Sequence, residues 1–215
     1  MKLGVLALQG AFREHAEIFA ALDADVTLVK RAEQLAALDA VVLPGGESTT
    51  QTKLLDSFGM RAPLVEALRA GLPCFATCAG MILLATEVLD GRPDQAPLGL
   101  LEISVRRNGY GRQVMSFEVP IVIRGVDGVD GTFNGVFIRA PRVERVGAGI
   151  DVLAAHEGVP VLVRRDNLWA AGFHPELAGD LRVHQAFIRS VVPGGIDWER
   201  IDERFSQRTN DTATR

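Results

Sequence analysis

The first 88 residues alternate short apolar runs with segments of helical periodicity, and this alternation constrains the fold more than any other feature. The apolar runs occupy residues 3–8, 25–29, 40–43 and 72–76. The helical segments occupy residues 13–22, 32–38, 49–58, 62–70 and the stretch that follows residue 78 to about residue 86. Nearly continuous apolar strands are typical of a sheet that is covered on both faces. We therefore predict an α/β fold with an open, mostly parallel sheet, right-handed crossovers and helices on both faces.

The pattern changes in the second half of the chain. A polar loop at residues 90–97 is followed, over residues 101–173, by short strand-like runs between Gly and Asp clusters. This pattern indicates hairpins and therefore an antiparallel extension of the sheet. An amphipathic helix at 181–192 closes the chain. With no repeat or linker in view, we expect a single domain over residues 1–205 and a polar, disordered tail over 206–215.

Composition narrows the classes of protein that the chain can represent. Its 215 residues suffice for one sizeable α/β domain, and 47% hydrophobic residues fit a well-formed core. A net charge of −4 gives no electrostatic reason to expect nucleic acid as a partner. No signal peptide and no apolar stretch of membrane-spanning length is found, so no membrane partner is expected. Cys74 and Cys78 are too few for a disulfide framework, which favours a reduced, cytoplasmic protein.

Cys78 lies between an apolar run and a helix-forming run. This is the layout of a sharp strand-to-helix turn with a nucleophile at its apex, and Ala76 and Gly80 are the small neighbours that such a turn requires. The N-terminus of a helix also favours the reactive thiolate. Taken alone, however, the cysteine fits a buried structural residue even better.

The segment His174-Pro175-Glu176 follows the last apolar run. Proline pushes the residue before it into an extended conformation, in which residues two apart project to the same side. His174 and Glu176 can therefore face one another, and a carboxylate fixes the tautomer of an imidazole. Alone, the segment would be interpreted as an exposed turn. Beside a cysteine at a nucleophile turn, it predicts a thiol triad of Cys78, His174 and Glu176.

The remaining polar features give weaker predictions. Gly45 and Gly46 can turn their N–H groups toward an oxyanion, but a glycine pair alone is weak evidence and an ordinary strand-end loop is the alternative. In the segment Glu47-Ser48-Thr49, either Ser48 or Thr49 can cap the next helix. We expect His15 to be a surface residue near the site, and His184 to be partly exposed on the closing helix. No histidine pair has metal-ligand spacing, so neither a metal nor a cofactor is predicted.

Several short motifs are present in the chain together with the cysteine and the His-Pro-Glu segment. They are Leu8-Gln9-Gly10-Ala11 with Arg13-Glu14-His15, Leu43-Pro44-Gly45-Gly46-Glu47-Ser48-Thr49-Thr50, Thr77-Cys78-Ala79-Gly80, Arg107-Asn108 with Gly111-Arg112-Gln113 and Ser116-Phe117-Glu118, Phe137-Ile138-Arg139-Ala140-Pro141, and Phe173-His174-Pro175-Glu176-Leu177. This set resembles class I (triad) glutamine amidotransferases, and within them the glutaminase subunits of pyridoxal 5′-phosphate synthases. The resemblance covers nearly the whole chain, to about residue 189, and implies a class I glutamine amidotransferase-like fold.

The resemblance implies a reaction and a set of roles. L-Glutamine would be hydrolysed to glutamate and ammonia, and the ammonia would pass to a partner synthase in a hetero-oligomer, a (β/α)₈ barrel that builds pyridoxal 5′-phosphate. Cys78 would be the nucleophile, His174 the general base and acid, and Glu176 its orienting carboxylate. The implied glutamine-binding residues are Gly46, Glu47, Ser48, Arg107, Ile138 and Arg139. The residues implied at the oxyanion hole or the partner interface are Gln9, Gly10, Gly45 and Ala79.

Three alternatives stand beside this interpretation. A glutaminase subunit of another amidotransferase, such as that of histidine biosynthesis, would share the triad. A non-catalytic interaction module on the same fold would be expected to lose at least one of the three triad residues. A thiol peptidase or hydrolase on a similar sheet would act on peptides or esters. The sequence also leaves open whether Arg107 or Arg139 pairs with the α-carboxylate of the substrate.

Overall fold

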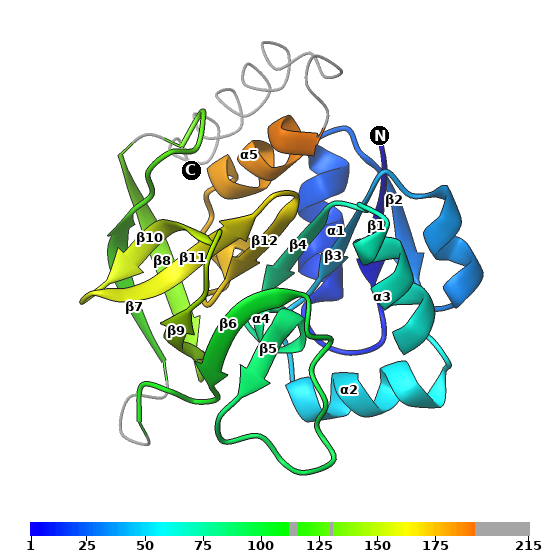
Figure 1. Cartoon of the computed structure of the whole chain (residues 1–215). Helices are drawn as coiled ribbons and strands as arrows, with labels where there is room; N and C mark the ends of the chain where they lie inside the picture. The colour runs from blue at the N-terminus through cyan, green and yellow to red at the C-terminus, as the bar shows by residue number, and fades with distance from the viewer. Residues whose placement is uncertain (112–115, 130, 192–215) are drawn as a thin grey trace.

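A computed structural model describes residues 1–111, 116–129 and 131–191 of the chain (Figure 1). The tail expected at 206–215, the domain limit predicted at residue 205 and residues 112–113 of one motif all lie outside these described residues. Within the described ranges, no helix is both long and apolar enough to cross a membrane.

A central sheet organises the described part of the chain, with its strands in the order β10-β11-β12-β4-β3-β1-β2. These strands are β1 (Lys2–Leu6), β2 (Asp25–Val29), β3 (Ala40–Leu43), β4 (Cys74–Thr77), β10 (Asp151–His156), β11 (Val159–Arg165) and β12 (Leu168–Ala171). From β12 to β2 all neighbours pair in parallel, whereas β10 and β11 are antiparallel additions. The predicted mostly parallel sheet with an antiparallel extension is confirmed.

Two smaller sheets lie beside the central one (Figure 1). Their strands are β5 (Ala85–Val88), β6 (Leu101–Arg106) and β9 (Arg142–Val146) in one sheet, and β7 (Ser116–Val122) and β8 (Thr132–Ile138) in the other. The helix predicted to reach about residue 86 ends at Leu84, because Ala85 turns to an extended conformation (ψ 155°) and starts β5. Strand β9 was not predicted, because its charged residues obscure the strand pattern; it pairs with β6.

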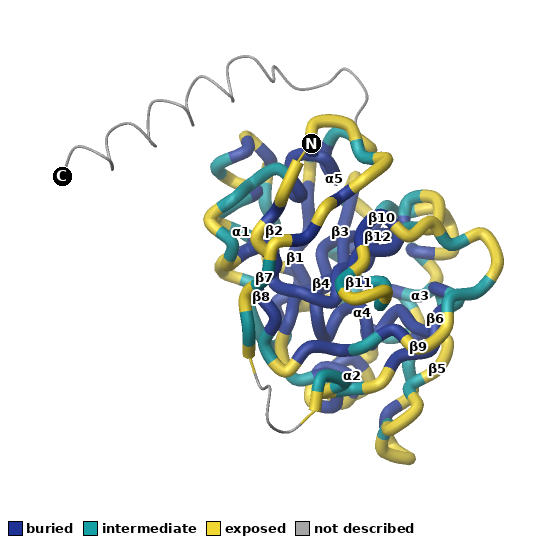
Figure 2. The backbone as a smooth tube through the Cα atoms, turned by 90° about the vertical axis from the view of Figure 1, so that its left-hand side faces the viewer, coloured by how far each residue is buried: buried dark blue, intermediate teal, exposed yellow. Residues whose placement is uncertain are grey.

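Helices cover both faces of the central sheet, as predicted. Helices α1 (Phe12–Ala21) and α5 (Arg182–Val191) pack on one face; the opposite face carries η1 (Ala32–Ala37, a 3₁₀ helix), α2 (Ser48–Ser57), α3 (Arg61–Arg69) and α4 (Ala79–Leu84). Strand β3 shows the division, because Ala40 and Val42 join the core under α1 and α5 while Val41 and Leu43 join the other core. The inner strands are accordingly buried along their length (Figure 2).

Two histidines lie deep in the core under α1 and α5, which corrects the prediction of exposed positions. His15 and His184 are both fully buried. On α1, His15 and Phe19 are four residues apart, and on α5 His184 precedes Phe187 by three, so each histidine continues an apolar stripe. The ring centroids of His15 and Phe75 lie 6.1 Å apart, edge to face. These polar rings therefore face the sheet and not the solvent.

Close packing at Gly80 sets the approach of α4 to the sheet. A Cβ added to Gly80 would collide with the backbone carbonyl oxygen of Leu43, the last residue of β3. The first turn of α4 can therefore lie against the end of β3 only if residue 80 lacks a side chain.

We expect the Gly80→Ala substitution to lower the free energy of unfolding by about 1–3 kcal/mol, because backbone atoms must separate to admit the methyl group. Urea unfolding measures the change. Gly172→Ala is the matched control, since an added Cβ at this buried glycine meets no atom closer than 3.4 Å. Equal stability of the two variants would contradict this account of the packing.

Candidate active site

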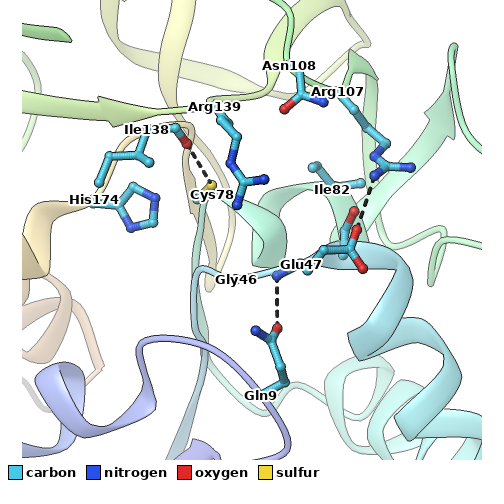
Figure 3. Close-up of a pocket in the computed structure, with 11 residues that line it drawn as sticks. Gln9, Gly46, Glu47, Cys78, Ile82, Arg107, Asn108, Ile138, Arg139 and His174 are labelled. Atoms are coloured by element: carbon cyan, nitrogen blue, oxygen red, sulfur yellow. Dashed lines mark hydrogen bonds and ion pairs between the residues drawn. The ribbon is translucent and has the colours of Figure 1, made fainter. Parts of the chain in front are cut away.

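A pocket of about 200 Å³ opens where the parallel strands of the central sheet end (Figure 3). Its lining residues are Gln9, Gly46, Glu47, Ser48, Cys78, Ile82, Arg107, Asn108, Ile138, Arg139 and His174. The pocket thus collects the residues that the sequence analysis assigned to nucleophile, base and glutamine binding. The other predicted site residues do not line the pocket but are adjacent to residues that do. They are Gly10, Gly45, Ala79 and Glu176. Open α/β sheets place their ligand sites at this edge.

Cys78 occupies the turn between β4, which ends at Thr77, and α4, which begins at Ala79. Its backbone has φ 47° and ψ −102°, a conformation that costs a non-glycine residue about 1–3 kcal/mol. A hydrogen bond from its N–H to the carbonyl of Ala171 (2.8 Å) ties the turn to β12. This is the sharp strand-to-helix turn that the sequence predicts. Cys74, by contrast, is fully buried, and burial raises the pKa of its thiol.

His174 and Glu176 face one another behind Cys78. The Nδ1 atom of His174 lies 2.7 Å from Oε1 of Glu176, and the N–H of His174 donates to the carbonyl of Val136 on β8. Burial lowers the pKa of His174, but hydrogen bonds to Cys78 and Glu176 outweigh it and raise the pKa to about 10. The imidazole therefore holds its proton at neutral pH, where a departing amine could receive it.

Glu176 is enclosed by histidines on both sides. Its second oxygen, Oε2, lies 3.3 Å from Nε2 of His15, and the carboxylate side chain has no solvent exposure. Burial acts to raise the pKa of Glu176, but the charge and hydrogen-bond interactions with His15 and His174 lower it well below its ordinary value. The carboxylate is therefore ionised across the physiological range and can orient the imidazole of His174.

The peptide between Gly45 and Gly46 lies beside the sulfur and the imidazole. The N–H of Gly45 donates to Oγ1 of Thr77 (2.9 Å), and the carbonyl of Gly45 accepts from Ala11 (3.0 Å). In a planar trans peptide the N–H of Gly46 points opposite to that carbonyl. The prediction that both glycines offer an N–H to a ligand is therefore wrong for Gly45, whose N–H is already bound. The N–H of Gly46 is the donor that this peptide can offer.

Gln9 and Gly10 hold this strand end in place. Oε1 of Gln9 accepts from the N–H of Glu47 (2.8 Å), as Figure 3 shows. Gly10 has φ 99°, and a Cβ there would collide with the carbonyl oxygen of Gly45. The two segments can approach this closely only because residue 10 is glycine. Residues 9 and 10 thus set the position of the peptide at residues 45 and 46.

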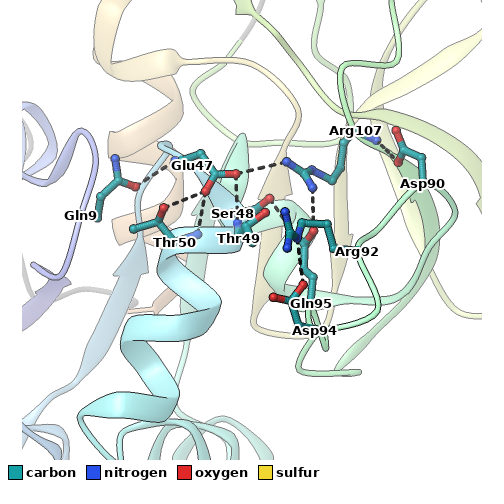
Figure 4. A network of polar contacts seen from close by, with 10 residues as sticks. All are labelled: Gln9, Glu47, Ser48, Thr49, Thr50, Asp90, Arg92, Asp94, Gln95 and Arg107. Atoms are coloured by element: carbon teal, nitrogen blue, oxygen red, sulfur yellow. Dashed lines mark hydrogen bonds and ion pairs between the residues drawn. The ribbon is translucent and has the colours of Figure 1, made fainter.

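Glu47 connects the start of α2 to Arg107, another residue that lines the pocket (Figure 4). It is the N-cap of α2, with Oε2 accepting from Thr50 (2.7 Å), so the expected caps Ser48 and Thr49 are wrong. Burial raises the pKa of Glu47, but the hydrogen bonds from Thr50 and Thr49 lower it overall. Its Oε1 also lies 3.1 Å from Nη2 of Arg107. The carboxylate therefore stays ionised at the pocket mouth.

Gln95 is a site residue that the sequence analysis missed. Its amide nitrogen donates to Oγ of Ser48 (2.8 Å), and its amide oxygen accepts from Nη1 of Arg107 (2.8 Å). It lies in the polar loop at residues 90–97 yet is only 6% exposed. No pattern in that loop distinguishes Gln95 from its neighbours, because its role depends on residues that are distant in the chain.

Strained backbone gathers around the pocket. Cys78, Asn108 and Arg139 all line it, and all have positive φ angles of 44–47° although none is glycine. Such conformations persist where the surrounding structure enforces them, and they cluster at functional sites. Asn108 belongs to a motif quoted above but was given no role, and Ile82 was not predicted at all.

The fold and the pocket together define a cysteine–histidine–carboxylate site at the edge of an open α/β sheet. A model of the SNO glutamine amidotransferase family matches residues 5–193, and the chain belongs to this family.

Curated relatives and a solved structure cover most of the chain. A Mycobacteroides abscessus protein named pyridoxal 5′-phosphate synthase subunit PdxT is 52% identical over 192 residues, 89% of this chain and 98% of the relative. A Streptomyces griseus protein of the same name is 53% identical over 189 residues, 88% of this chain and 95% of the relative. A crystal structure described as a glutamine amidotransferase has a TM-score of 0.82 at 46% identity, covering 88% of this chain and 98% of its own.

Proposed function

We propose that this chain is the glutaminase subunit of a pyridoxal 5′-phosphate synthase. It hydrolyses L-glutamine to L-glutamate and ammonia. The observation that carries the proposal is the placement of Cys78 at the pocket, backed by the His174–Glu176 pair, in a chain of the glutamine amidotransferase family. The named relatives favour the vitamin B6 synthase over the glutaminase of histidine biosynthesis.

The chemistry follows from the positions of three side chains. The sulfur of Cys78 attacks the carboxamide carbon of glutamine, and the N–H groups of Gly46 and Ala79 stabilise the oxyanion that forms. Ala79 is the first residue of α4, so its N–H has no partner within the helix. His174 gives its proton to the departing ammonia and leaves a γ-glutamyl thioester. It then takes a proton from water, which attacks the thioester and releases glutamate.

Charges at the pocket suit the zwitterionic end of glutamine. The ionised carboxylate of Glu47 can accept from the α-ammonium group. Arg107 is already engaged by Glu47 and Gln95, whereas no ion pair involves Arg139 in the described part of the chain. Arg139 also points into the pocket beside Cys78 (Figure 3). We therefore assign the α-carboxylate to Arg139, with Ser48 and Ile138 lining the space between.

Ammonia must reach its acceptor before it is protonated in water, and a docked partner provides that route. The relatives are named as subunits of a synthase, which supports a partner for this chain as well. We propose a (β/α)₈-barrel synthase as that partner, docking near the segment around Gln9 and Gly10. Cys74 and Cys78 are both free thiols, which suits a reducing compartment, and we place the reaction in the cytoplasm.

Ammonia release from glutamine tests the function directly. We expect release to rise when the barrel synthase is added to the wild-type chain, and Cys78→Ala to lower it by at least about a thousandfold. Cys74→Ala is the matched control and should retain activity, because Cys74 lies in the core away from the pocket. An absent response to the synthase, or an active Cys78→Ala variant, would refute the proposal. No ammonia release by the wild-type chain at all would favour a non-catalytic module.

The Gln95→Leu variant tests whether Gln95 positions the pocket residues Ser48 and Arg107 for glutamine binding. Removing the amide frees Ser48 and Arg107, and losing a hydrogen bond to a charged group costs about 1.5–3 kcal/mol. We therefore expect the KM for glutamine to rise roughly tenfold or more, with a smaller change in kcat. Asp94→Asn is the control from the same loop, since within the described ranges Asp94 forms ion pairs only with the exposed residues Arg92 and Lys53. Equal KM values for both variants would contradict the role of Gln95.

A further inference from the structure

Two further histidines continue the line of Cys78, His174 and Glu176 into the core, and the reaction described above does not use them. Nε2 of His15 lies 3.3 Å from Oε2 of Glu176, and Nδ1 of His15 lies 3.2 Å from Nε2 of His184. All of these side chains are buried. The line therefore starts at the pocket, passes through the segment that follows β12, continues through α1 and ends at α5.

The polar contacts of the two rings assign one proton to each of them. An ionised carboxylate only accepts, so the atom of His15 that faces Glu176 must carry a proton. Burial lowers the pKa of His184 to about 3, so His184 is neutral and carries a single proton. Among the described residues Nδ1 of His184 has no hydrogen-bond partner, and a buried N–H without a partner is rare. The proton of His184 is therefore on Nε2, where it is donated to Nδ1 of His15.

Thr77 joins this line to the peptide beside the sulfur. Its Oγ1 lies 3.0 Å from Nε2 of His15 and accepts the N–H of Gly45. The N–H at Nε2 of His15 is thus hydrogen-bonded to Thr77 and faces Oε2 of Glu176 at 3.3 Å as an electrostatic contact, without hydrogen-bond geometry. One imidazole contacts both the carboxylate that orients His174 and the residue that fixes Gly45.

We propose that His15 is a positioning residue for the glutaminase reaction. It holds the Glu176 carboxylate in the position where that carboxylate orients His174. Through its contact with Thr77, it also fixes the position of Glu176 relative to the peptide at Gly45. This inference rests on the proposed function. His184 fixes the tautomer of His15 and thereby directs the proton of Nε2 toward Glu176.

A space-filling role alone does not explain a histidine at this place. The neighbours of the ring include Phe19 and Phe75, with centroids 6.4 and 6.1 Å from that of His15. Phenylalanine would fill such a site without the cost of burying polar atoms. Only histidine also supplies a donor at one ring nitrogen and an acceptor at the other. The packing then fixes the ring plane in which both bonds are made.

Kinetics of three variants, each assayed with the synthase present, separate positioning from packing. His15→Phe keeps a ring but removes the donor, and we expect kcat to fall about tenfold to a hundredfold with KM for glutamine nearly unchanged. His15→Gln restores an N–H at the position of Nε2 and should recover most of kcat. His156→Gln is the control, because this partly buried histidine on β10 lies outside the network and should leave both constants unchanged.

The pH profile gives a second readout that packing alone would not move. Titratable groups facing Glu176 are His174 from its own segment and His15 from α1, with His184 from α5 behind them. Interaction with His15 lowers the pKa of Glu176, so its removal raises that pKa. We therefore expect the acid limb of kcat/KM to move to higher pH in His15→Phe and not in His15→Gln. Equal losses in both variants with an unmoved acid limb would overturn the proposal.

Nitrogen NMR of wild-type protein labelled with ¹⁵N-histidine tests the hydrogen-bond line without any variant, including the case in which His15→Phe does not fold. The chain has four histidines, so the ring signals can be assigned. We expect His15 and His184 both to carry their proton on Nε2. A proton on Nδ1 of His184 would overturn the proposal. Because this readout needs no activity, its failure is distinguishable from failure of the glutaminase assay.

Discussion

The hydrogen bond from the N–H of Cys78 to the carbonyl of Ala171 fixes the turn on which the site depends. It holds a non-glycine residue at φ 47°, where strain of about 1–3 kcal/mol must be balanced by the surrounding sheet. The turn ends β4 and starts α4 within one residue, and Gly80 lets that helix lie against Leu43. The sulfur is consequently placed at the carboxyl ends of the parallel strands, where side chains that follow other strands also lie.

Electrostatics at this edge depend on burial and on pairing together. Burial alone would neutralise both Glu176 and His174. Hydrogen bonds to Cys78 and Glu176 raise the pKa of His174, and interactions with His15 and His174 lower the pKa of Glu176, so both remain charged. The same pairing aims the imidazole at Cys78, and His15 completes the enclosure of the carboxylate. Acid–base chemistry is therefore prepared by the protein before any substrate binds.

Local patterns predicted the parts of the site that local chemistry determines. The alternation of strands and helices predicted the parallel sheet. The pairing of His174 with Glu176 was also predicted, but the extended segment assumed for it was wrong, because Pro175–Leu177 forms a 3₁₀ helix. Contacts between distant segments were not predictable in this way. The bond between Gly45 and Thr77 spans 32 positions, and nothing near either residue announces it. His15 was misplaced because its polarity was weighed above the apolar stripe to which it belongs.

Covalent labelling with an electrophilic analogue of glutamine tests the central claim, that the strained turn makes one of two cysteines the nucleophile. The labelled chain, with its synthase partner present, is digested and the modified peptide is identified by mass spectrometry. We predict one equivalent of label on Cys78, with Cys74 unmodified because it is fully buried and the pKa of its thiol is raised. Label on Cys74, or none on Cys78, would contradict it.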